Sequence, residues 1–70
     1  MKDIDFLKHL LSDAAQELEY LESYEKKIDD AEENNAGYAE LWKMRTSSRQ
    51  RIRDDLSMIR RVSLEVERRL

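Results

Sequence analysis

Cysteine and proline are absent from this chain of 70 residues, and glycine occurs only once, at Gly37. The absence of cysteine excludes disulfide bonds, thiolate nucleophiles and cysteine-ligated zinc. No apolar run approaches the roughly 18 residues that a membrane span requires, so we expect no membrane partner. A charged start, Met1-Lys2-Asp3, without an apolar leader favours a cytoplasmic protein.

Groups that perform catalysis are also scarce. The single histidine, His9, cannot supply the two Glu-x-x-His pairs of a di-iron helical bundle, and no glycine-rich phosphate loop or nucleophile motif is present. The acidic run from Asp29 to Glu33 lacks the glycine-centred loop of a calcium-binding EF-hand, so we interpret it as a solvated face. The sequence therefore predicts a protein that is not an enzyme and has no cofactor or metal.

Charge and helical periodicity, in contrast, are abundant. Charged residues make up 41% of the chain, which is typical either of a disordered polyelectrolyte or of long helices. Apolar residues recur at steps of three and four, which favours helices. The first series, with Glu25 in its one vacant place, is Ile4, Leu7, Leu11, Ala14, Leu18, Leu21 and Ile28. The second is Tyr38, Leu41, Trp42, Ile52, Leu56, Ile59, Val66 and Leu70.

The two series are separated by the only turn signal in the sequence, Asn34-Asn35-Ala36-Gly37. Asparagine and glycine tolerate the left-handed backbone that ends a helix. We predict a single all-α domain over residues 1–70, with one helix from about residue 3 to 33, a turn at 34–37 and a second helix from about 38 to 69. A connection this short forces the helices into an antiparallel, coiled-coil-like hairpin.

The two halves of the chain carry opposite net charges. Residues 1–35 contain four lysines and eleven acidic residues, a net charge of −7, whereas residues 36–70 contain nine basic and five acidic residues, a net charge of +4. Near the turn the sequence R-T-S-S-R interrupts the apolar series with arginines. Because acidic residues of the first helix lie at the matching height, we predict a charged contact across the hairpin. Its residues are Glu22, Glu25, Asp29, Arg45 and Arg49, with Arg45 paired to Glu25 and Arg49 to Glu22.

Folding the chain about residue 35 places residue i roughly opposite residue 70 minus i. This rule predicts the facing pairs Ile52 with Leu18, Leu56 with Ala14, Ile59 with Leu11 and Val66 with Ile4. Both helices carry more apolar surface than one contact consumes, so we expect two hairpins to form a four-helix bundle as a homodimer; a different helical protein would serve equally well. The predicted dimer or partner face is Leu7, Leu10, Leu11, Leu18, Ile52, Leu56, Ile59, Val62 and Val66.

The arginines of the second helix also permit a nucleic-acid interpretation. Aromatic stacking together with phosphate contacts would bind a nucleic acid through Trp42, Arg45, Arg49, Arg53 and Arg60. The remaining basic residues do not form one stripe, and the chain is acidic overall, with a net charge of −3. The acidic first half suggests a further alternative, a protein that mimics the charge of DNA.

One stretch of the second helix has a wider resemblance. The pattern Tyr38-x-x-Leu41, then Arg45, then Arg49-x-Arg51-Ile52-Arg53-Asp54-Asp55-Leu56-x-x-Ile59, follows an acidic helix that contains Glu19-Tyr20-Leu21-Glu22. Over about residues 15–60 the chain resembles small uncharacterised helical-hairpin proteins of phages and prophages of Gram-positive bacteria. That resemblance implies an accessory or regulatory protein. We therefore expect a non-catalytic protein–protein interaction module.

Overall fold

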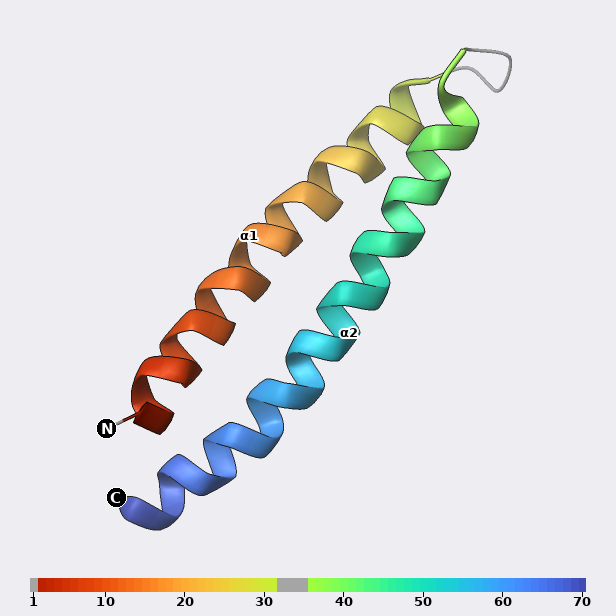
Figure 1. The fold of residues 1–70 in the computed structure, drawn as a ribbon. Coiled ribbons are helices and arrows are strands. Elements are labelled where there is room, and N and C mark those ends of the chain that lie inside the picture. Colours follow the sequence, from red (N-terminus) through yellow and green to blue (C-terminus); the bar gives the residue numbers. More distant parts are fainter. Residues whose placement is uncertain (1, 32–35) are drawn as a thin grey trace.

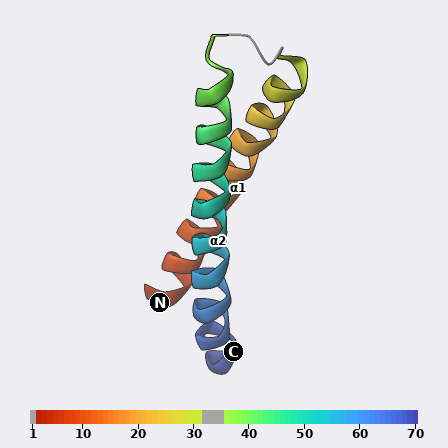
Figure 2. The same ribbon diagram turned by 90° about the vertical axis from the view of Figure 1, so that its right-hand side faces the viewer.

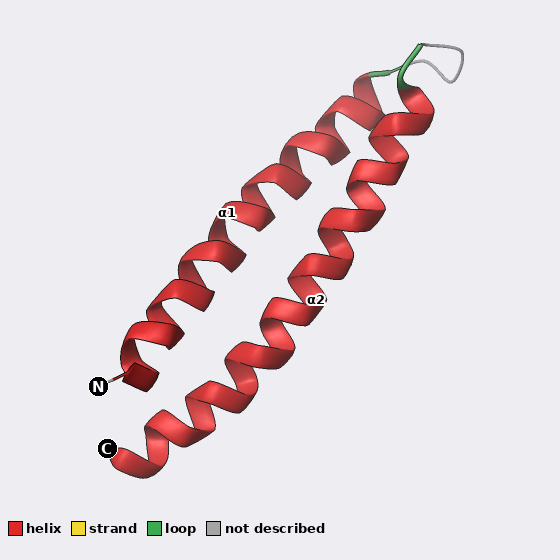
Figure 3. Cartoon of the chain, in the orientation of Figure 1, coloured by secondary structure: helices red, strands yellow, loops and turns green. Residues whose placement is uncertain are grey.

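Two long helices make up almost all of the structure. The computed structural model describes residues 2–31 and 36–70, and within them it contains α1, Lys2–Asp30, and α2, Tyr38–Arg69, with no strand. The helices run antiparallel, so that the beginning of α1 and the end of α2 lie at the same end of the hairpin (Figure 1; Figure 3). The predicted all-α hairpin is confirmed in this respect.

The bounds of α2 coincide with the range predicted for the second helix. In contrast, α1 ends at Asp30, whereas the helix was expected to continue to about residue 33. That expected end and the asparagines of the turn lie outside the described residues. Gly37 precedes α2 with φ at 97°, a left-handed backbone that favours glycine, and its carbonyl accepts a hydrogen bond from the N–H of Leu41 at 3.0 Å. This residue therefore sets the direction in which α2 begins.

The line along which the two helices pack, here called the seam, follows a heptad pattern on both helices. Buried and half-buried residues recur at steps of three and four. On α1 the seam residues are Asp3, Leu7, Leu10, Ala14, Glu17, Leu21, Tyr24 and Ile28, and Ala31 continues the series just after the helix. On α2 they are Tyr38, Leu41, Arg45, Ser48, Ile52, Asp55, Ile59, Val62 and Val66.

The predicted seam of α1 was wrong at alternate positions. Leu11 and Leu18 were expected to face α2, but both are exposed, and the seam instead contains Leu10 and Glu17, each one residue earlier. Leu56 of α2 is exposed for the same reason, since Asp55 occupies its expected place. The predicted facing pairs that involve Leu11, Leu18 and Leu56 are therefore wrong. A shift of one residue turns a side chain by 100° around the helix.

The hairpin is long and thin, measuring 53 × 14 × 14 Å along its principal axes. In the view turned by 90°, the two helices cross each other instead of running side by side along their whole length (Figure 2). The buried residues of the seam are few: Leu10, Ala14, Ile28, Ser48, Ile52 and Val66. Neither described helix contains a stretch that is long and apolar enough to cross a membrane.

Candidate interaction surfaces

The middle of the seam is polar. Ser48 has an exposed fraction of 0%, and its hydroxyl donates a hydrogen bond to the backbone carbonyl of Glu17 at 3.4 Å. The Nε of Arg51 lies 3.1 Å from Oε1 of Glu17, forming an ion pair between the helices. Because serine is small, α1 can approach α2 closely at this level, and the polar groups of both helices find partners there.

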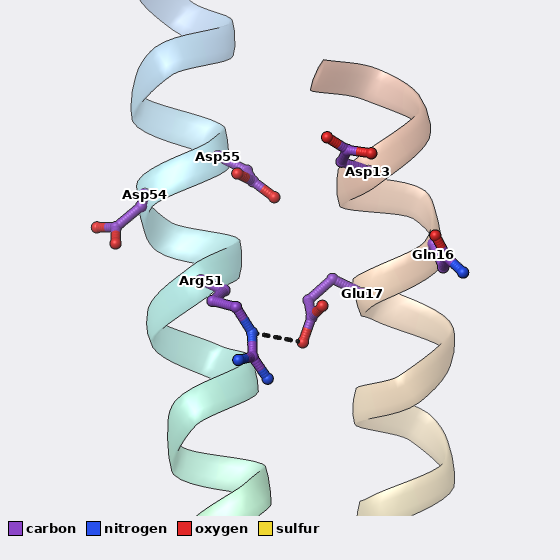
Figure 4. Close-up of a pocket in the computed structure, with 6 residues that line it drawn as sticks. All are labelled: Asp13, Gln16, Glu17, Arg51, Asp54 and Asp55. Carbon is purple, nitrogen blue, oxygen red and sulfur yellow. Dashed lines mark hydrogen bonds and ion pairs between the residues drawn. The ribbon is translucent and has the colours of Figure 1, made fainter. Parts of the chain in front are cut away.

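This ion pair lies in a hollow of about 360 Å³ on one side of the hairpin (Figure 4). In Figure 4 the carboxylates of Asp13 and Asp55 point toward the opposite helix, whereas Asp54 points away from α1. The hollow is lined by Asp13, Gln16, Glu17, Arg51, Asp54 and Asp55. We call this the acidic side. In the part of the chain that the structure describes, no group of three or more histidine, aspartate or glutamate side chains is arranged to hold a metal ion.

A second charged contact lies near the turn. The Nε of Arg45 is 3.5 Å from Oε1 of Glu25, and the Arg45 guanidinium lies 4.9 Å from the centre of the Trp42 ring. The Trp42 ring in turn packs edge-on against Tyr38, with 6.3 Å between the ring centres. Arg45 is thus held both by a carboxylate and by an aromatic face, which are two favourable environments for a guanidinium.

The structure brings together only part of the predicted charged contact. Arg45, Glu25 and Asp29 line one hollow with Ile28 and Trp42. Arg49 and Glu22 are both exposed, and the ion pairs of the described residues include neither of them. The prediction that these two residues pair within the hairpin is therefore wrong.

Two ion pairs between the helices were missed by the sequence reasoning. Besides Arg51 with Glu17, Nη1 of Arg69 lies 2.7 Å from Oδ2 of Asp3 near the chain ends. The folding rule places Arg51 opposite residue 19, within one turn of Glu17, so the signal was present. It was overlooked because the expected seam left Glu17 on the surface.

The Arg45 contact yields a measurable coupling. We expect Arg45→Glu and Glu25→Arg each to destabilise the hairpin, and the double variant to recover about 0.2–1 kcal/mol, the usual range for a partly exposed ion pair. Urea unfolding of the four proteins of this cycle, followed by circular dichroism, measures that coupling. Strictly additive losses would show that the pair makes no direct contribution. Glu22→Arg combined with Arg45→Glu is the matched control and should show no coupling.

The opposite side of the hairpin exposes a row of leucines. Leu11, Leu18 and Leu56 have exposed fractions of 51%, 45% and 47%. Each directly follows a seam residue in the sequence, as do Glu25 and Trp42, which line one hollow near the turn. Residues of the acidic side, such as Asp13 and Arg51, instead come directly before a seam residue in the sequence. The helical repeat therefore places the leucines on the side of Glu25 and Trp42, away from the acidic side. We call it the leucine side.

The predicted dimer or partner face must be corrected accordingly. Six of its nine members lie in the hairpin's own seam and are buried or half-buried there, so they are not available to a partner as predicted. These six are Leu7, Leu10, Ile52, Ile59, Val62 and Val66. Only Leu11, Leu18 and Leu56 remain exposed.

The predicted nucleic-acid residues are brought together in part. Arg45, Arg49 and Arg53 line one hollow of about 270 Å³ with Thr46 and Gln50. Arg60 lies seven residues beyond Arg53 and continues the same row along the helix. Trp42 has an exposed fraction of 41%, but the guanidinium of Arg45 lies over its ring and competes with a base that would stack there.

Comparison of the chain with models of known protein families, with curated proteins and with solved structures gave no match. The resemblance to helical proteins of phages and prophages therefore stays a prediction. A function for this chain has to be argued from its own surfaces.

Proposed function

We propose that this chain is a non-catalytic protein–protein interaction module, in which two hairpins associate through their leucine sides into a four-helix bundle. The observation that supports this proposal is the exposure of Leu11, Leu18 and Leu56 on one side of the hairpin. The absence of cysteine is compatible with a cytoplasmic protein. In line with the sequence resemblance, its role would be that of an accessory or regulatory protein of a phage or prophage.

The width of the apolar stripe on α1 supports association. A helix in a two-stranded coiled coil needs apolar residues at two of every seven positions, whereas a helix that packs against two neighbours needs a third. On α1 this third position is filled by Ile4, Leu11 and Leu18, at intervals of seven residues. In a lone hairpin Ile4 is half-buried, but Leu11 and Leu18 remain exposed, and a bundle would bury them.

The energetic scale indicates a dimer of modest affinity. Burying the remaining half of a leucine side chain contributes about 1 kcal/mol, so six leucines across a two-fold dimer contribute about 6 kcal/mol. Association costs about 4–15 kcal/mol in lost translational and rotational freedom. The leucines alone therefore offset only the lower part of this range, and further contacts between the copies must contribute.

Sedimentation velocity across a wide range of protein concentrations tests this proposal. We expect the mass to rise from one copy to two, and Leu18→Glu to weaken association at least about 30-fold because it places a charge in the apolar contact. Leu64→Glu is the matched control, since Leu64 has a similar exposure but lies outside the leucine side. A single copy at every concentration, or equal effects of the two substitutions, would refute the proposal.

A second candidate function is nucleic-acid binding, which is favoured by the hollow that Arg45, Arg49 and Arg53 share. Binding through phosphates would weaken steeply as the salt concentration rises, because each neutralised phosphate releases a counterion. Fluorescence anisotropy with a labelled mixed-sequence oligonucleotide at low salt measures this binding directly. We expect Arg53→Glu to abolish such binding, and the absence of any signal at low salt would eliminate this candidate.

A further inference from the structure

The leucine side carries opposite charges on its two helices. On α1, the charged residues that directly follow a seam residue are acidic toward the turn: Glu22, Glu25 and Asp29. On α2, those from Arg49 toward the C-terminus are mostly basic, namely Arg49, Arg53 and Arg60, with Glu67 near the end. Over their full lengths, α1 contains four lysines and nine acidic residues, and α2 contains nine basic and five acidic residues. A second copy that covers the leucines must therefore also place its charges opposite charges of the other sign.

Two aligned arrangements place the leucine sides of two copies against each other. A two-fold axis parallel to the helices lays α1 of each copy on α2 of the other, with both turns at the same end. A two-fold axis across the helices lays α1 on α1 and α2 on α2, with the turns at opposite ends. The two arrangements bury the same leucines, so hydrophobic burial does not distinguish them.

Electrostatics separates the two arrangements. The axis across the helices would bring the arginine row around Arg53 against its own copy. It would also place the acidic part of α1 over the first turns of α1, where Lys8 is the one basic residue among Ile4, Lys8 and Leu11. Like charges placed opposite each other across an interface are unfavourable by several kcal/mol. The axis parallel to the helices instead makes every pair of neighbouring helices one acidic and one basic helix, and like helices lie on the diagonal.

The height of individual residues points to a specific contact. The ion pair between Glu25 and Arg45 shows that these two residues lie at the same height along the hairpin. Glu22 lies about one turn from Glu25 toward the chain ends, and Arg49 lies about one turn from Arg45 in the same direction. An axis parallel to the helices preserves height. Glu22 of one copy therefore meets Arg49 of the second copy, and neither residue belongs to an ion pair of the described hairpin.

We propose that a second copy packs on the leucine side about a two-fold axis parallel to the helices, so that α1 lies against α2 of the other copy and two Glu22–Arg49 ion pairs form between the copies. This arrangement rests on the proposed function, because it requires that the hairpins associate. It adds the orientation of the copies, the order of the helices in the bundle and the charges that select them.

A charge-swap experiment tests the pair between the copies. Arg49→Glu alone places two acidic residues opposite each other at both contacts of a dimer, and Glu22→Arg alone places two arginines there. We expect each variant to associate about tenfold more weakly than the parent chain, and an equal mixture of the two variants to recover most of that loss as a mixed dimer. Sedimentation velocity measures all three samples, and circular dichroism verifies that each variant remains helical.

The mixture distinguishes contacts between copies from contacts within one hairpin. If Glu22 paired with Arg49 of its own chain, each variant would retain its repulsion after mixing, and only the double variant on one chain would recover. Failure of the mixture to recover would therefore overturn the proposed pair. Arg68→Glu, at an exposed residue outside the leucine side, is the control and should leave association unchanged.

The orientation of the copies is tested separately by a spin label. Because the chain has no cysteine, Glu40→Cys provides a single attachment site near the turn, on the side away from the leucines. We expect electron–electron double resonance to give a distance between the spin labels of the two copies that is no greater than the width of the bundle. A distance near the hairpin length of 53 Å would overturn this arrangement while leaving association intact. A single copy at all concentrations would refute the association itself.

Discussion

Replacing Leu10 with alanine is expected to lower the free energy of unfolding by about 2–4 kcal/mol, whereas the same replacement at Leu11 should lower it by less than about 1 kcal/mol. The two residues are neighbours in one helix and have the same side chain. They differ in burial, since Leu10 has an exposed fraction of 8% and Leu11 of 51%. Removing the buried side chain leaves a cavity against α2, but removing the exposed one leaves none within the hairpin.

Urea unfolding at low protein concentration, where dimers dissociate, measures this difference. A loss of this size is comparable to the roughly 3–5 kcal/mol that the core of a chain this short supplies, so a stabilising osmolyte should be included for the Leu10 variant. At high concentration, Leu11→Ala should also reduce the rise of stability with protein concentration, because Leu11 belongs to the leucine side. Equal losses at the two positions in dilute solution would show that the seam is not the one described.

Enlarging Ser48 to leucine is expected to destabilise the hairpin by about 1–3 kcal/mol, while the same change at Ser47 should stay within about 0.5 kcal/mol. Ser48 is fully buried against α1, where its hydroxyl contacts the backbone of Glu17, so there is no room for three additional carbon atoms. Ser47 is exposed. Both substitutions change the intrinsic helix propensity equally, so the difference between them reports the packing of the two helices.

Thermal unfolding of both variants by circular dichroism checks this expectation. Ser48→Ala is a useful companion, because it removes the hydroxyl without adding volume and should cost only about 1 kcal/mol. If Ser48→Leu were as stable as Ser47→Leu, the helices would have to be further apart at this level than the structure shows. The ion pair between Arg51 and Glu17 would then also be in doubt.

The sequence was sufficient to predict a helical hairpin. The apolar period and the absence of proline identify long helices, and the sole glycine marks the beginning of α2 at Tyr38. The contact of Arg45 with Glu25 was also expected, because opposite charges at equal distances from the turn lie at the same height in an antiparallel hairpin. These features depend on local preferences and on the length of the chain between them, which a linear pattern contains.

The sequence alone did not determine which residues of α1 face α2. Two overlapping heptad series run along α1 and share Leu7, Ala14, Leu21 and Ile28. The series with Leu11 and Leu18 is the more apolar, but the structure packs the series with Leu10 and Glu17 against α2. The opposite helix decides between them, because Ser48 allows a close approach and Arg51 supplies the counter-charge for Glu17. Since the rejected series remains apolar, the same choice creates the exposed leucines of the leucine side.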